Sequence, residues 1–354
     1  MSAPLPIDDL DALSEWRIRG VVDDEPVELG RLVFAMMFFL RTPDGAAARR
    51  RMTEAIPRCR ELVGDRSFTT AIIRSYDADR MVDADQMVPL DHPADFIEVE
   101  RLWEGAIDQA SPSLTLVDCP KASIPGFCLE VDAPRSNHLI TAVNSLQLNV
   151  PVWRLGESEF VGEAAAAFRD LSVLLRPHHA QAGLCMATNR NLLVMQEGRE
   201  IIYPVLRQHP YLMSDWALQF QLKLGHLANT IGWMTSVSDD LLVACGGAGA
   251  LPEMIGPSVH GIHPYDGGVT IQISERPRIF DCRADAEAHR FGTVARALRP
   301  SRTHPGLIQH YDRIYGSYQK PGCRVPTEDE NIFFWNDELV RESQAEYLSR
   351  MDDP

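Results

Sequence analysis

The sequence predicts an α+β or mixed α/β fold, in which largely antiparallel strands form one or more sheets with flanking helices. Two observations support this prediction. Strand-like and helix-like segments interleave without the regular strand–helix–strand rhythm that builds a parallel sheet. Residues 259–262 and 269–274 are also predicted as strands joined by Pro264-Tyr-Asp-Gly-Gly268, whose Asp-Gly pair is typical of a hairpin turn.

The first half of the chain is predicted to alternate between the two kinds of element. The stretch 28–41 is long, apolar and bulky, as in a buried strand. A helix from Ala46 is expected to stop at Gly64, and Pro57 inside it is expected to kink or shorten it. The predicted elements are a helix at 9–16, a strand at 28–41, a helix at 46–63, a strand at 67–76, an acidic amphipathic helix at 94–110, and strands at 113–117, 127–131 and 146–153.

The second half is predicted to hold shorter elements around the hairpin. Two short helices are expected within 233–256, with Ser236 or Ser238 as the first N-cap and Gly246-Gly247 as its stop. The other predicted elements are a helix at 162–175, a strand at 182–188, and helices at 197–208, 284–298 and 335–351.

Length and composition are those of a globular protein, with 354 residues of which 45% are hydrophobic. We expect an acidic segment at 1–26 followed by one domain at 27–354, which divides into two lobes (27–155 and 156–354) if it divides at all. No apolar run approaches the length of a membrane span, and the acidic N-terminus lacks the pattern of a signal peptide. A cytoplasmic protein is therefore expected, with its seven scattered cysteines reduced and mostly buried.

The net charge of −16 is concentrated in three segments. Residues 1–26 carry 7 acids and 2 bases, residues 77–108 carry 10 and 2, and residues 321–354 carry 9 and 3. Direct binding to nucleic acid is disfavoured, because it requires clustered cations. The pattern fits a basic protein partner, although acidic segments that only keep a protein soluble would look the same.

No known catalytic or metal-binding motif is present. The cluster Gly246-Gly-Ala-Gly249 lacks the strand context of a phosphate loop and is better explained as a helix stop. His178 and His179 are adjacent and so diverge, and His260, His263 and Asp266 match no known ligand spacing. We therefore predict no catalytic residue, cofactor or metal. A hydrolase site assembled by the fold from His178, His260 or Cys185 stays an alternative.

Aromatic residues near acids are candidates for a protein interface, although most are expected to be ordinary core. Trp335 is the favoured anchor, because it closes Phe333-Phe-Trp335 just after Glu328-Asp-Glu330. The other candidates are Tyr211, Trp216, Phe220 and Trp233.

The segment 233–300 carries a family resemblance. It contains Trp233-Met-Thr, the pair Gly246-Gly247, the strand Gly267-Gly-Val-Thr-Ile-Gln272 and the helix end Val294-Ala-Arg-Ala-Leu-Arg-Pro300. In these residues the chain resembles the type VI immunity family, once a domain of unknown function. It departs from the family at Asp281, where a glycine more usually precedes the aspartate.

The resemblance implies a cytoplasmic immunity protein that is not an enzyme. Such proteins are encoded beside antibacterial effectors of the type VI secretion system, several of them nucleases, and occlude the active site of the cognate toxin. A basic nuclease domain is the expected partner, and an adaptor or chaperone that loads the effector is the alternative. The predicted partner-binding residues are Asp91, Asp95, Glu98, Glu104, Glu328, Asp329, Glu330 and Trp335. The oligomeric state is not predicted.

Overall fold

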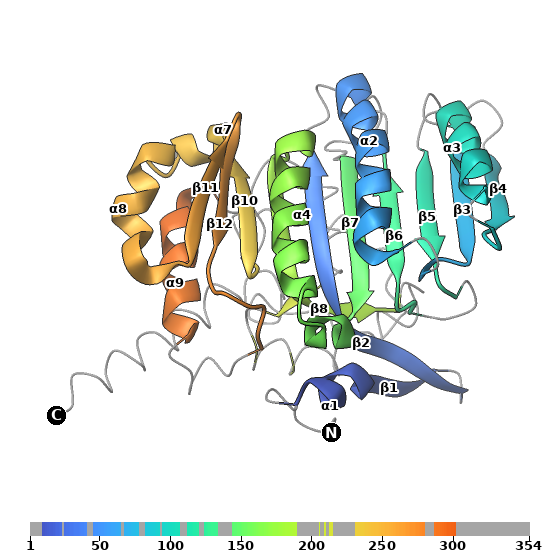
Figure 1. Ribbon diagram of the computed structural model, residues 1–354, viewed down its shortest axis with the longest axis horizontal. Helices are drawn as coiled ribbons and strands as arrows, with labels where there is room; N and C mark the ends of the chain where they lie inside the picture. Colours follow the sequence, from blue (N-terminus) through green and yellow to red (C-terminus); the bar gives the residue numbers. More distant parts are fainter. Residues whose placement is uncertain are drawn as a thin grey trace, which may run out of the picture.

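The fold is built on one long sheet with helices packed against it (Figure 1). A computed structural model of the protein describes residues 9–22, 25–40, 45–64, 67–77, 82–92, 94–106, 112–119, 124–133, 144–189, 205, 209, 212–214, 231–279 and 287–301.

Twelve strands of the described chain form a single sheet, in the order β11-β12-β10-β8-β2-β7-β6-β5-β3-β4, with β1 paired to β2 and β9 to β8. All pairs are antiparallel except β8 with β9. The strands are β1 (Arg17–Val22), β2 (Glu25–Leu40), β3 (Thr70–Asp77), β4 (Val82–Pro89), β5 (Ser113–Val117), β6 (Cys128–Asp132), β7 (Asn144–Pro151), β8 (His179–Thr188), β9 (Met213–Ser214), β10 (Met234–Ser238), β11 (Gly261–Tyr265) and β12 (Gly268–Gln272).

Strand β2 lies at the centre of the sheet and explains its extent. Its first half pairs with β1, and its second half lies between β7 and β8. Residues 32–40 are all buried, so both faces of this strand are covered. A strand buried on both faces needs a continuous apolar run, and the sequence 32–40 supplies one.

Three helices cover one face of the sheet, and α7–α9 pack at the β10–β12 end (Figure 1). On the covered face, α2 lies between α4 and α3. The described α-helices are α1 (Leu10–Glu15), α2 (Gly45–Val63), α3 (Asp95–Ala106), α4 (Phe160–Leu175), α7 (Asp239–Val243), α8 (Leu251–Ile255) and α9 (Glu287–Leu298). Short 3₁₀ turns are η2 (Val152–Gly156), η3 (Ala248–Ala250), η4 (Gly256–Ser258) and η5 (Arg299–Ser301). None of the described helices is long and apolar enough to cross a membrane.

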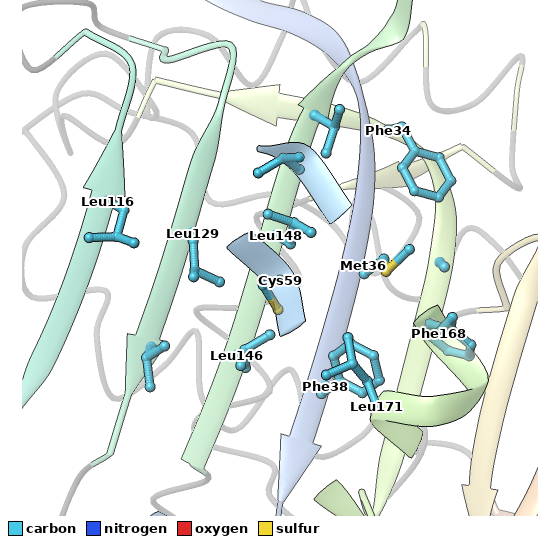
Figure 2. Close-up of a cluster of buried hydrophobic side chains, with 14 of the residues drawn as sticks. Phe34, Met36, Phe38, Cys59, Leu116, Leu129, Leu146, Leu148, Phe168 and Leu171 are labelled. Atoms are coloured by element: carbon cyan, nitrogen blue, oxygen red, sulfur yellow. The ribbon is translucent and has the colours of Figure 1, made fainter. Parts of the chain in front are cut away.

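The main core lies between the sheet and the helices α2, α3 and α4 (Figure 2). Alternate residues of β2, Phe34, Met36 and Phe38, point to this side, because successive side chains of a strand face opposite ways. Phe168 of α4 packs against Phe38 with ring centroids 5.1 Å apart. Cys59 of α2 is fully buried in the same cluster.

The predicted fold class is confirmed, and most predicted elements are present within a few residues. Some expectations were incomplete. The two short helices expected within 233–256 are present as α7, with Ser238 as its N-cap, and α8, but residues 234–238 before them form strand β10. Strands β1 and β4 occupy stretches where no strand was expected. Helix α2 ends at Val63 before Gly64, as predicted, and Pro57 does not shorten it. The predicted helices at 197–208 and 335–351 lie outside the described residues.

Candidate functional site

Helix α3 presents the clearest candidate surface in the described part of the chain. It packs beside β3 and β4 at one end of the sheet (Figure 1). Phe96, Val99 and Trp103 are buried on its inner side at helical spacing. The Asp95 carboxylate accepts a hydrogen bond of 2.7 Å from the backbone N–H of His92, which closes the turn at the start of the helix.

The outer side of α3 is acidic. Glu98, Glu100 and Glu104 are exposed, and Arg101 is the only basic residue of the helix. The Arg101 Nε atom donates to Glu98 Oε2 at 2.8 Å, and this hydrogen bond lowers the pKa of the Glu98 carboxyl. With Asp95 at its start, the helix carries three more negative than positive charges. This excess makes the exposed side of α3 attractive to cations.

A groove of about 220 Å³ lies between α2 and α3. Its floor is apolar and includes Leu114 and Leu116 from β5, a strand that lies between α2 and α3 (Figure 1). Pro57 lines it from α2, and Glu100 and Glu104 line it from α3. The groove is therefore an apolar hollow with carboxylates along one wall.

Contacts between α2 and α3 hold the walls of this groove. The Arg60 guanidinium lies over the Phe96 ring, 3.4 Å from its centroid, and Arg60 Nη1 is 3.4 Å from Glu100 Oε1. Trp103 Nε1 donates to Thr53 Oγ1 at 3.0 Å. Stacking, charge pairing and this hydrogen bond each restrict side chains that would otherwise rotate. The groove is thus formed by the fold before any partner is bound.

The predicted partner-binding acids fall into two groups. Asp91 is exposed in the turn before α3, and Asp95, Glu98 and Glu104 lie on the helix itself. Asp95 and Glu98 are three residues apart and share one flank of the helix, whereas Glu104 is nine residues from Asp95 and faces the opposite flank, where it lines the groove. The other predicted residues, Glu328, Asp329, Glu330 and Trp335, lie outside the described chain.

The residues of the alternative hydrolase site do not come together. His178 Nδ1 is 3.1 Å from Ser238 Oγ, beside the start of β8. Cys185 lies six residues further along that strand than His179, a separation of about 20 Å in extended chain. His260 is exposed just before β11, three strands away from β8. This combination therefore cannot form a catalytic centre.

Near the hairpin turn, Asp266 and His263 have basic residues as neighbours. Asp266 Oδ2 is 2.7 Å from Arg176 Nη2, at the end of α4. The pKa of His263 is lowered by burial and then by the charges of Arg169 and His260. Within the described chain, no three His, Cys, Asp or Glu residues are grouped so that they could hold a metal ion.

Glycines and aromatics outside α3 mostly have structural roles. Gly246 and Gly247 have positive φ, and Gly247 N donates to Leu242 O at 2.7 Å, which ends α7 as a helix stop does. Trp233 is 2% exposed and donates from Nε1 to Ser274 O, so it belongs to the core. The candidates Tyr211, Trp216, Phe220 and 333–335 lie outside the described residues.

The groove itself was not predicted. The periodicity of α3 indicated its apolar side, but Arg60 and Glu100 are 40 residues apart and no local pattern joins them. Pro57, which lines the groove, was singled out only as a residue that can disturb a helix.

Comparisons with known proteins agree with the resemblance in the sequence. The family model TsiV, described as type VI immunity for VRR-NUC, matches residues 113–317, which is more than half of the chain. Among solved structures, a T6SS protein of Pseudomonas aeruginosa superposes with a TM-score of 0.63 at 17% identity, over 92% of this chain and 87% of that one. At this identity the likeness concerns the fold. No curated protein matches the sequence significantly.

Proposed function

The chain belongs to the TsiV family of type VI immunity proteins, and we propose that it binds a cognate type VI effector nuclease and neutralises it by covering its active site. The family match is the observation that carries this proposal. A nuclease acts on nucleic acid inside the cell, so its inhibitor would act in the cytoplasm. The protein would need no catalysis of its own.

The charge of the described surface supports this proposal. A nuclease must attract a phosphate backbone and therefore exposes cations around its active site. The acidic side of α3, with Glu98, Glu100 and Glu104 exposed, has the opposite charge. Opposed potentials accelerate encounter and orient the partners, and salt weakens this effect.

Co-expression tests the proposal directly. The effector encoded beside this gene is expressed in a sensitive bacterial host, with and without this protein, and survival and chromosomal DNA integrity are measured. The expected result is that DNA stays intact and cells survive only when both proteins are present. Purified protein should also inhibit DNA cleavage in vitro at a 1:1 ratio to the effector. Degraded DNA despite stable complex formation would contradict the proposal.

The same experiment separates the alternatives. An adaptor that loads the effector would bind it and support its export, but it need not protect the cell from it. A hydrolase acting on the toxin would protect at far less than equimolar amounts, whereas occlusion needs one inhibitor for each toxin. We expect protection to increase with the molar ratio of this protein to the effector and to reach its maximum at a ratio of one.

A further inference from the structure

We propose that the groove between α2 and α3 is an anchor pocket for one long basic side chain of the partner effector, an arginine or a lysine. This inference rests on the proposed function and specifies how the partner is recognised. The groove joins an apolar floor, Leu114 and Leu116, to a wall that carries Glu100 and Glu104. An aliphatic stem with a cationic end fits both parts.

The size of the groove favours a side chain over a small molecule. Pockets for drug-sized ligands and cofactors have volumes of about 300–1,000 Å³. The groove, at about 220 Å³, is smaller than this range. Protein interfaces commonly place one large anchor residue in a pocket of this kind, and arginine is among the residues most often found there.

The charges along the wall point to Glu104 as the acceptor. Glu100 already lies 3.4 Å from Arg60, whose guanidinium also covers the face of Phe96. No described residue forms an ion pair or side-chain hydrogen bond with the Glu104 carboxylate. An incoming cation would therefore be attracted to the carboxylate of Glu104, while Arg60 disfavours a position further towards Phe96.

The groove is held in shape before binding. The Trp103–Thr53 hydrogen bond and the stacking of Arg60 on Phe96 connect the two helices across it. Walls that are already ordered lose little conformational entropy when a partner arrives, so more of the contact energy appears as affinity.

One test fills the groove. Pro57 is exposed at the groove and lacks the N–H that an α-helix interior requires, so Pro57→Phe adds a ring there while restoring a backbone donor. The matched control Ala47→Phe adds the same ring at an exposed position near the start of α2. Affinity for the catalytically inactive effector encoded by the adjacent gene is measured by calorimetry, and folding by thermal melting.

The second test changes the charge. Glu104→Gln keeps the size of the side chain and removes its charge. Asp170→Asn is the control for net charge, because it removes the same single charge and Asp170 is exposed on α4, from which α3 is separated by α2 (Figure 1). We expect Pro57→Phe to weaken binding by about 30-fold or more, the loss of a hot-spot residue, and Glu104→Gln by about tenfold. Ala47→Phe and Asp170→Asn should each change it by less than about fivefold.

The outcomes separate this inference from the proposed function. Wild-type protein that neither binds nor protects overturns the function. Wild-type protein that binds and protects, with Pro57→Phe and Glu104→Gln within about twofold of it, overturns the anchor pocket alone. If Pro57→Phe has a lower melting temperature than the wild type, the affinity of Glu104→Gln alone tests the anchor pocket. Each basic residue of the effector is then replaced by alanine in turn. One of these replacements should weaken binding so that Glu104→Gln causes no further loss of affinity, as expected of residues in contact.

Discussion

Trp103 and Trp153 provide a comparison of one residue type in two environments. Trp103 is 1% exposed, inside the packing of α3 on α2 and the sheet, whereas Trp153 in η2 is 47% exposed. Replacing each by alanine removes the same atoms. The loss of stability should therefore follow burial and contacts instead of residue type.

The two magnitudes can be estimated from the contacts. Trp103→Ala leaves a cavity and should cost about 3–5 kcal/mol of unfolding free energy. It also removes the 3.0 Å hydrogen bond to Thr53, which adds about 1 kcal/mol. Trp153 makes an edge contact with Phe127, with ring centroids 6.4 Å apart, so Trp153→Ala should cost about 0.5–1.5 kcal/mol.

Urea denaturation followed by circular dichroism measures both changes. A lower midpoint with an unchanged slope identifies a change in stability alone. The conservative variant Trp103→Phe keeps most of the ring and should fall between the wild type and Trp103→Ala. If Trp103→Ala proves no more destabilising than Trp153→Ala, the packing of α3 described above is wrong.

Three further predictions concern single residues. Gly247→Ala should lower the free energy of unfolding by about 1 kcal/mol, because the φ of +87° at Gly247 disfavours a side chain. Gly249→Ala should be close to neutral, because Gly249 has no positive φ and no atom within 4 Å of the new Cβ. The urea midpoints of the two variants test this comparison. A maleimide reagent applied to the native protein should label the exposed Cys119 and spare Cys59, whose thiol pKa burial raises to about 12. Labelling of Cys59 as fast as Cys119, measured by peptide mass spectrometry, would show that α2 is loosely packed. Burial raises the pKa of Tyr265 to about 12, above the usual 10.0, so the unfolded chain loses this proton first. The associated stability is intact below pH 10 and is lost as the pH rises towards 12, and Tyr265→Phe should reduce this loss in urea midpoints measured at about pH 9 and pH 11.

The sequence was most informative where one local pattern has one structural solution. The apolar run at 32–40 predicted a strand buried on both faces, and β2 is that strand. The Asp-Gly turn predicted the β11–β12 hairpin for a similar reason, since few residues tolerate the backbone of a tight turn. Helix α3 was predicted from side chains at helical spacing.

Predictions failed where tertiary partners outweighed local preference. Two short helices were expected within 233–256, with Ser236 or Ser238 as the first cap, and the first helix begins after Ser238 as its N-cap. The residues before it, 234–238, instead complete the sheet between β8 and β12, where Ser236 Oγ lies 3.1 Å from Thr270 Oγ1. Pro57 was expected to disturb its helix. The helix continues because the proline faces outward and the opposite side of α2 is held in the core by Cys59.

By itself the sequence determined the fold class, the long central strand, the acidic helix and the resemblance to an immunity family, because each depends on residues close together in the chain. Only the tertiary structure decided that Glu104 lines a groove against α2, and that His178 and Cys185 lie too far apart to react together. Contacts such as that of Arg60 with Phe96 join distant segments. They form only when the sheet brings these segments together, so no local pattern in the chain encodes them.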